Sequence, residues 1–569
     1  MRVSNETYRC NTEKLLGRSQ ILLLGFCLML ISFIGIWVYF FFGHDLIRSI
    51  YNNEIPWLSD LIKRQSEHSV EYYVEIADHA VKNLAILAAL MFIMFAGLQE
   101  WCRRHTNSFA TCTIWRRMLL MTGTVWLIYL LKIPVFQILP YWFWSLNNKP
   151  LPYWILLVPI LTITIAVSYL VLRRPYRKTS NMLLLITLCY CLQLGFGLME
   201  GRGMRSLSNR LTDTGGNARI AHTGTQWSAN HLLQSYSSMV QSGELTQFPH
   251  ATKPPGPVIV FAVLNQISAY LHIEGNTRPE ALANFAVWVL PLIASLTLLP
   301  LWGLCYIAFS DQKERWLPLV LYISVPSILL IVPPFDQNLL PFVSTTCIYL
   351  MARAMTGGSI LLAFTCGGIF YLSLFISFGL ITIACIIAVL AFFFATSNPS
   401  WFKQAKNCSA VVAGTITAHF CAFFLFGYDA LSQFRLGISA HQTFKFADWG
   451  LLHTIYFGAL NMVEFGLWCG PSLAILCGVQ LYRICKRLPP RENVDTIVLA
   501  LGVVMVGLAL FGHTAGETAR LWIFLIPFVC FSGARCLVTM KADSMLPVLS
   551  VITLQLGTVM IIKSFQDFF

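Results

Sequence analysis

The sequence predicts an all-α, polytopic integral membrane protein with about fifteen transmembrane helices. Of its 569 residues, 56% are hydrophobic and only 11% are charged, whereas soluble domains carry roughly 25% charged residues. The apolar residues come in blocks long enough to cross a bilayer as helices, the form in which one segment satisfies its own backbone hydrogen bonds in lipid. This composition excludes a soluble globular protein and a disordered chain.

Apolar blocks predict where the chain crosses the membrane. The first block has too long an apolar core, and no small-residue cleavage pattern, for a cleavable signal peptide. Residues 257–272 are apolar but short, begin at Pro257 and follow Pro254 and Pro255, so we expect a short or re-entrant helix that makes no net crossing. The predicted crossings are 20–42, 82–98, 118–140, 154–172, 181–198, 284–308, 317–334, 338–354, 359–376, 379–397, 408–426, 455–481, 495–511, 519–538 and 545–562.

The basic residues predict the orientation. The formal net charge is +13, and Lys and Arg gather at the N-terminus and in the loops 99–117, 173–180 and 482–494. Positive loops favour the cytoplasm, so we expect a cytoplasmic N-terminus. No nucleic-acid partner is expected, because these charges lie in short loops and not on one soluble face. Of 17 cysteines none falls in 43–81 or 199–256, and no CxxC pair occurs, so neither a disulfide framework nor a zinc knuckle is indicated.

The outer loop 199–256 is the richest polar stretch on the opposite side. Residues 228–243 have the apolar spacing of an amphipathic helix, which can lie in the membrane interface. The sequence HATKPPG then leads back into the membrane. The ionisable residues of the loop include Glu200, Arg202, Arg210, Asp213, His222, Glu244, His250 and Lys253.

Four motifs on this side resemble those of a known superfamily. They are KPPG at 253–256, Asp336 within VPPFDQNLLPF, the late pair Asn461 and Glu464, and GETARLW at 516–522. Together they resemble the GT-C superfamily of membrane glycosyltransferases, in particular the protein-mannosyltransferase-like family 39 branch and its bacterial subgroup with HPPGP at this place. The resemblance covers 181–540 and implies a GT-C-like domain at 179–569, with a large outer loop and interfacial helices, after an N-terminal bundle, 1–178, of unassigned role. The family usually has a pair of acidic residues at the start of the outer loop, whereas this chain has Glu200 and a single aspartate, Asp213.

The resemblance implies transfer of a sugar from a polyprenyl-phosphate donor to a glycan, lipid or protein acceptor at the outer face of a bacterial inner membrane. A carboxylate has to take the proton from the acceptor hydroxyl or hold a metal ion, and cations have to stabilise the phosphate leaving group. No cofactor is required by the sequence; Mg²⁺ or Mn²⁺ is the divalent cation such carboxylates would hold. The implied residues are the catalytic Asp213, Asp336 and Glu200, the phosphate-binding Lys253, Arg520 and Arg210, and the supporting Glu517 and His250.

Other interpretations stay open at this point. Asp213 lies in TDTGGN, a good turn sequence, Asp336 can cap a helix, and Lys253 can be an interfacial lysine. The acidic outer loop 43–81 is a rival site, although no KPP-like motif follows it. A transporter or flippase for a lipid-linked saccharide is the alternative function, and it predicts repeats and broken helices. A non-catalytic scaffold is a third.

Overall fold

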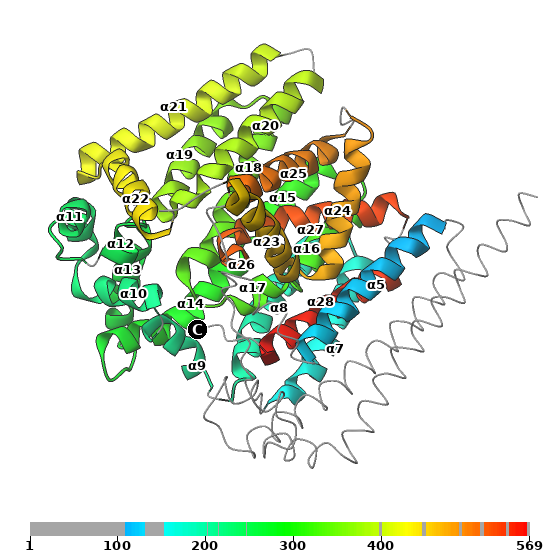
Figure 1. The fold of residues 1–569 in the computed structure, drawn as a ribbon, viewed down its shortest axis with the longest axis horizontal. Helices are drawn as coiled ribbons and strands as arrows, with labels where there is room; N and C mark the ends of the chain where they lie inside the picture. Colours follow the sequence, from blue (N-terminus) through cyan, green and yellow to red (C-terminus); the bar gives the residue numbers. More distant parts are fainter. Residues whose placement is uncertain are drawn as a thin grey trace, which may run out of the picture. The chain divides into compact units, whose positions relative to one another are not determined.

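The protein is helical throughout the part of the chain that the structure describes (Figure 1). The predicted crossings 20–42 and 82–98 and the rival loop 43–81 lie outside the described residues. The computed structural model describes residues 109–130, 153–201, 203–213, 215–245, 247–397, 401–445, 451–488, 492–511, 517–541 and 545–565. The chain divides into two compact units: unit 1 comprises 1–138, 145–150 and 544–567, and unit 2 comprises 139–144, 151–543 and 568–569.

Two described helices of unit 1 pack against each other: α5 (Phe109–Leu130) and α28 (Met545–Phe565). Trp126 Nε1 donates a hydrogen bond to Thr558 Oγ1 at 3.0 Å. A side chain at Gly557 would overlap the Trp126 ring, so glycine permits the close approach. Helix α28 agrees with its predicted crossing, whereas α5 begins at residue 109 and takes in part of the loop predicted at 99–117.

In unit 2, the first helices form an antiparallel pair joined by a short basic turn. Asn181 Nδ2 closes that turn by donating to the carbonyl of Arg174 at 2.9 Å. Further along the pair, Gln193 Nε2 donates to Ser295 Oγ at 3.0 Å and links this region to a later helix. The elements are η2 (Trp154–Leu156), α7 (Leu157–Arg173), α8 (Lys178–Leu198) and the partner helix α14 (Arg278–Ser295).

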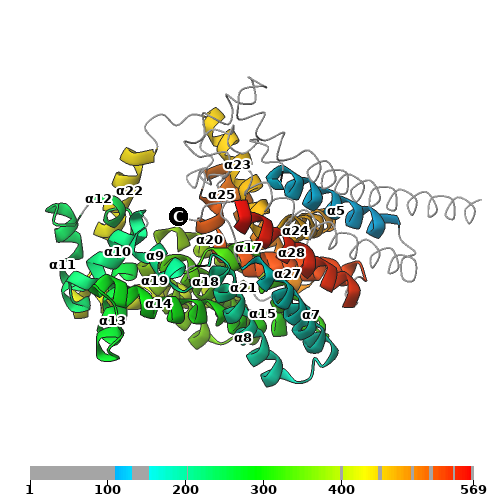
Figure 2. The same ribbon diagram turned by 90° about the horizontal axis from the view of Figure 1, so that it is seen from below.

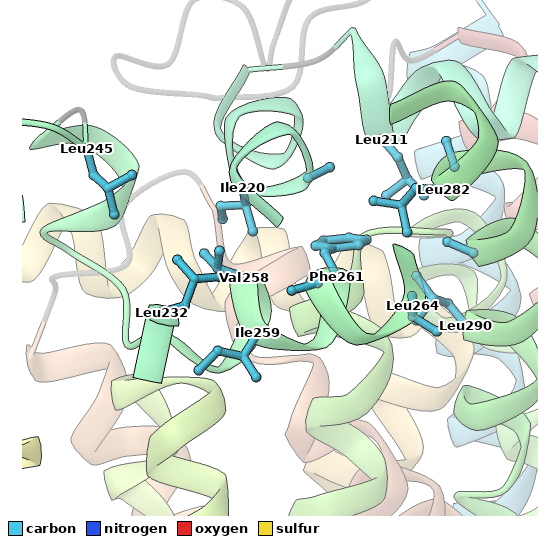
Figure 3. Close-up of a cluster of buried hydrophobic side chains, with 14 of the residues drawn as sticks. Leu211, Ile220, Leu232, Leu245, Val258, Ile259, Phe261, Leu264, Leu282 and Leu290 are labelled. Atoms are coloured by element: carbon cyan, nitrogen blue, oxygen red, sulfur yellow. The ribbon is translucent and has the colours of Figure 1, made fainter. Parts of the chain in front are cut away.

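The predicted outer loop folds into a cap of helices at one end of unit 2 (Figure 2). Its apolar side chains meet in one buried cluster, which Figure 3 shows around Phe261. The predicted amphipathic helix is confirmed: Ser228 caps it by accepting from the His231 N–H, and its apolar face is buried. The cap elements are α9 (Arg205–Thr212), α10 (Gly215–Gln226), α11 (Ala229–Gln241), α12 (Gln247–His250) and α13 (Gly256–Tyr270).

The first half of helix α13 is buried in this cap, and its second half is largely exposed. Phe261 and Val258 pack against α10, where a side chain at Gly224 would overlap Phe261. With 15 residues, α13 is shorter than the helices that can cross a membrane by length. This agrees with the short helix predicted at 257–272; its lack of a net crossing stays a prediction.

One predicted crossing, 317–334, is wrong as a continuous helix. It consists of short helices interrupted by irregular backbone, and all its residues are buried. Pro326 begins the second piece, and Pro333 and Pro334 prevent its continuation because proline lacks the N–H that a helix requires. Irregular backbone is tolerated at membrane depth only where protein covers it. The elements here are α15 (Leu298–Ala308), η3 (Glu314–Trp316), α16 (Leu317–Tyr322), α17 (Pro326–Leu330) and α18 (Phe335–Gly357).

The next helices pack through glycines. Side chains at Gly367 and Gly414 would overlap the backbone of the facing helix, so α19 and α21 approach as closely as small residues allow. The outer side of α21 exposes Phe420, Phe424 and Leu425, as expected for a helix in contact with lipid. The elements are α19 (Ile360–Ile376), η4 (Phe378–Ile381), α20 (Thr382–Ser397), α21 (Trp401–Phe426) and α22 (Ala430–Lys445).

A second predicted crossing, 455–481, is also wrong as one straight helix. It is a pair of helices bent by 118° at Gly470. Gly470 has φ 86, a conformation open to glycine at little cost, so the break is encoded at that residue. The last elements of unit 2 are α23 (Leu451–Cys469), α24 (Pro471–Cys485), α25 (Asn493–Phe511), α26 (Thr518–Leu521), η5 (Ile523–Leu525) and α27 (Ile526–Thr539).

Within the described residues, seven helices are long and apolar enough to cross a membrane, or eight if the bent pair is one span. The expected number of about fifteen is not confirmed. The shorter apolar helices include α7, α13 and α19. The seven are 178–198, 278–308, 338–357, 378–395, 401–426, 493–510 and 545–565.

Candidate functional site

Glu200 and Arg210, two of the predicted site residues, form a largely buried ion pair. Glu200 follows α8, and Arg210 lies in the last turn of α9. The chain reverses between them through Gly201 and Gly203, which have φ 77 and 60. Positive φ is costly for other residues, so these glycines permit the turn that brings the acid to the arginine.

The same guanidinium joins α9 to a distant part of the chain. Arg210 Nη1 donates to the carbonyl oxygens of Leu330, at 3.3 Å, and Val332, at 2.8 Å. Val332 lies in the short segment between α17 and α18, and the peptide bond to Pro333 is cis. Because both terminal nitrogens of Arg210 donate to protein atoms, the structure gives this residue a positioning role. Its predicted contact with phosphate stays a prediction.

The segment that Arg210 holds leads directly to Asp336, the second residue of α18. Val332 is four residues before the predicted carboxylate Asp336. Its carbonyl accepts from Arg210, the residue that forms the ion pair with the other predicted carboxylate, Glu200. The side chain of Asp336 lies outside what the structure describes. The distance between the two carboxylates therefore stays untested.

Asp213 ends α9, three residues after Arg210. Its side chain is exposed, and Oδ1 accepts a hydrogen bond from Thr212 Oγ1 at 2.7 Å. This local contact matches the turn interpretation of TDTGGN. An exposed carboxylate is also accessible to an acceptor hydroxyl, so the geometry is compatible with both interpretations.

His250 and Lys253 belong to a hydrogen-bonded junction inside the cap. The His250 ring is buried, with Nε2 3.1 Å from Thr223 Oγ1, and its carbonyl accepts from the Tyr236 hydroxyl at 3.2 Å. Gln433, on α22, donates from Nε2 to the carbonyl of Lys253 at 3.3 Å, and its Oε1 accepts from a serine of α11 at 2.9 Å. The junction holds the KPPG segment between α11 and α22.

Burial has an electrostatic consequence at this junction. Tyr236 is almost fully buried, and desolvation raises the pKa of its phenol well above the usual range. The neutral phenol therefore persists, and it can keep donating to the His250 carbonyl. The side chain of Lys253 is partly exposed beside this junction.

The late motifs meet where α23 contacts α26. Glu464, fully buried on α23, accepts at Oε1 from the backbone N–H of Ala519 at 3.0 Å. The Phe465 and Trp522 rings lie 5.3 Å apart between centroids. Arg520 Nη2 and Glu517 Oε2 are 3.2 Å apart, so the ion pair expected from their spacing is present. The roles predicted for Arg520 and Glu517 stay predictions.

Helix α17 links these groups. It packs against α8, which ends beside Glu200, and against α23, which carries Glu464. Its last residue, Leu330, accepts from Arg210. The sequence could not show this, because α17 was predicted as part of a continuous crossing.

Metal ligation gains no support from the described side chains: among them, no three His, Cys, Asp or Glu residues come close enough together to hold an ion. His222 is exposed on α10, and His231 stacks on Trp227 with centroids 4.9 Å apart. The side chains of His441 and His513 lie outside the described residues.

Comparison with known proteins leaves the family open. No protein-family model matches the chain, and no curated protein matches it either. The apolar blocks and the seven or eight long helices support the coarser conclusion. The chain is a helical, multi-pass membrane-type protein.

Proposed function

We propose that the protein is an integral membrane glycosyltransferase that moves a sugar from a polyprenyl-phosphate donor to an acceptor at the outer membrane face. The observation that carries this proposal is the contact of Arg210 with both Glu200 and Val332. This contact joins Glu200, one predicted acid, to the backbone segment that leads to Asp336, the other. The resemblance of the KPPG and GETARLW motifs to GT-C enzymes gives the reaction class.

In the proposed reaction, a carboxylate of Asp213, Asp336 or Glu200 accepts the proton of an acceptor hydroxyl as that oxygen bonds to the anomeric carbon. The bond from the anomeric carbon to the phosphate oxygen breaks, and polyprenyl phosphate leaves with the electron pair. Lys253 and Arg520 supply positive charge where negative charge grows on the phosphate. Arg210 positions Glu200 relative to the segment that leads to Asp336.

The proposed setting is a bacterial inner membrane with the N-terminus in the cytoplasm. The distribution of Lys and Arg favours the cytoplasmic N-terminus, and the resemblance to the bacterial subgroup gives the choice of membrane. In this orientation the cap α9–α13 lies at the outer surface, where a lipid-linked donor and its acceptor meet.

The direct test is transfer of a radiolabelled sugar from polyprenyl-phosphate donors by membranes that contain the protein. Asp213→Asn, Asp336→Asn and Lys253→Ala are each expected to lower transfer, and loss of the general base costs about 100-fold or more. Glu244→Gln is the matched control, because Glu244 is exposed in the same cap. Full transfer by all three site variants would overturn the site.

A transporter for a lipid-linked saccharide is the second candidate function. The break between α23 and α24 at Gly470, with its 118° bend, is the observation in its favour, because transporters use discontinuous helices near their substrate. Movement of an intact lipid-linked sugar across proteoliposomes, without covalent change, would favour it over the enzyme.

A further inference from the structure

The junction of α23 and α26 contains buried polar side chains whose hydrogen-bonding capacity is unused. Asn461, on α23, is fully buried, and neither Nδ2 nor Oδ1 has a hydrogen-bond partner in the described part of the chain. Burying an amide without a partner costs about 1–3 kcal/mol. Such exceptions in a folded protein require an explanation, and a bound ligand is one.

Asn461 faces α26. Asn461 and Glu464 are three residues apart and therefore lie on the same side of α23. This side of α23 points toward α26, because Glu464 accepts a hydrogen bond from the N–H of Ala519, a residue of α26. Three further buried donors on or beside α26 lack hydrogen-bond partners within the described residues: Thr518 Oγ1, Arg520 Nε and Trp522 Nε1.

The combination of groups indicates the ligand chemistry. The Asn461 amide can donate and accept at once, and a threonine hydroxyl can do the same. A sugar hydroxyl also donates and accepts, so vicinal hydroxyls match this set. A fully ionised phosphate offers no hydrogen to Asn461 Oδ1, so Asn461 matches the sugar hydroxyls, whereas Arg520 on α26 is the group assigned to the phosphate.

We propose that Asn461, with Thr518 and Trp522, forms the subsite that binds the hydroxyl groups of the transferred sugar. This inference rests on the proposed function and deepens it by assigning the sugar end of the donor. Helix α23 packs against α17, and Leu330 at the end of α17 accepts from Arg210, so α17 connects the helix that carries Asn461 to the Arg210–Glu200 ion pair.

Binding by the full chain in nanodiscs tests the subsite. The probes are undecaprenyl phosphate alone and undecaprenyl phosphate that carries glucose, mannose, galactose or arabinose. The wild type is expected to bind one of the sugar-bearing lipids about 10-fold or more tightly than the bare lipid, which corresponds to about 1.4 kcal/mol. Asn461→Leu is expected to abolish that difference and to leave the Kd for the bare lipid unchanged.

A melting measurement separates a ligand site from a structural role. Asn461→Leu removes an unpaired polar group and is expected to keep or raise the Tm. Asn407→Leu is the matched control, because Asn407 is buried on α21 and donates to the Ala354 carbonyl at 3.2 Å. It is expected to lower the Tm and to preserve the preference for the sugar-bearing lipid.

The outcomes separate the two proposals. If the wild type transfers sugar and Asn461→Leu keeps the full preference for the sugar-bearing lipid, the subsite is overturned and the proposed function stands. A fall in Tm for Asn461→Leu together with an unchanged preference also overturns the subsite, because Asn461 then has a structural role alone. If the wild type neither transfers sugar nor distinguishes the lipids, both proposals are overturned.

Discussion

Arg210 Nη1 donates a hydrogen bond to the carbonyl oxygen of Val332, 2.8 Å away and 122 residues further along the chain. With the ion pair to Glu200, this contact ties the end of α8, the helix α9 and the segment before α18 to a single guanidinium. Arginine suits this task because its planar group directs several donors at fixed angles. The guanidinium of Arg210 therefore connects Glu200 to the segment that leads to Asp336.

Arg210→Ala is expected to lower the stability of unit 2 by about 3–5 kcal/mol, because it removes the cation that pairs with a mostly buried carboxylate and donates to two carbonyls. Thermal unfolding of the purified protein in detergent measures the change. Arg205→Ala is the control. Arg205 is exposed, and its ion pair with Glu280 is long, at 3.8 Å, so its loss should change the stability little. Equal melting temperatures for the two variants would contradict the role given to Arg210.

Gln433→Leu is expected to loosen the KPPG segment, because it removes the donor to the Lys253 carbonyl and the acceptor of the α11 serine. Each lost hydrogen bond costs about 1 kcal/mol. Hydrogen exchange of residues 247–256 should rise in the variant and stay unchanged in Gln404→Leu, a buried glutamine on α21. Unchanged exchange at 247–256 in Gln433→Leu would refute the junction.

Tyr236 predicts a loss of stability in alkali. Burial raises the pKa of its phenol, so the folded state favours the neutral form. Its contribution is complete below the unfolded pKa of about 10 and is lost as the pH rises above that value. Tyr236→Phe should therefore melt lower than the wild type at pH 8 and lose less stability between pH 9 and 11. Parallel curves for the two proteins would show that Tyr236 does not carry the effect.

Glu464 is expected to hold α26 in place. Glu464→Gln keeps an oxygen for the Ala519 N–H, whereas Glu464→Leu removes it and exposes the donor to an apolar neighbour. Proteolysis or hydrogen exchange at 517–522 should therefore increase in the leucine variant and much less in the glutamine variant. An equal increase in both variants would show that the charge, which both substitutions remove, and not the hydrogen bond is what α26 requires.

An epitope inserted after Gly243 tests the predicted orientation, because this residue is exposed between α11 and α12. It should react with antibody on intact spheroplasts. The same epitope after Arg487, in the basic loop that follows α24, should react only after permeabilisation. The opposite pattern would invert the orientation.

The sequence predicted correctly those helices whose apolar residues follow a single regular pattern from end to end. The amphipathic pattern at 228–243 predicted α11 and its buried face, and the apolar blocks predicted most of the described long helices. It failed at 317–334 and at 455–481, because hydropathy does not separate a helix in lipid from irregular backbone covered by protein. Pro326 and Gly470 are the local signals that could have shown those breaks.

The candidate site was predictable only in its residue types. Glu517 and Arg520 pair at a spacing that the sequence displays. The contacts of Arg210 with Val332 and of Glu464 with Ala519 join segments far apart in the chain, which periodicity cannot reveal. Asn461 stood out in the sequence only through the resemblance, and the sequence could not show that its amide is buried without a hydrogen-bond partner among the described residues.

Glycosyl transfer is measured by the release of polyprenyl phosphate from the purified protein in proteoliposomes that contain a lipid-linked sugar donor and an acceptor extract. Mass spectrometry can follow the donor and the bare lipid together. One bare polyprenyl phosphate is expected for each sugar transferred, and its release should be lost in Asp213→Asn or Asp336→Asn. A donor that stays intact while it moves across the bilayer would contradict the enzyme.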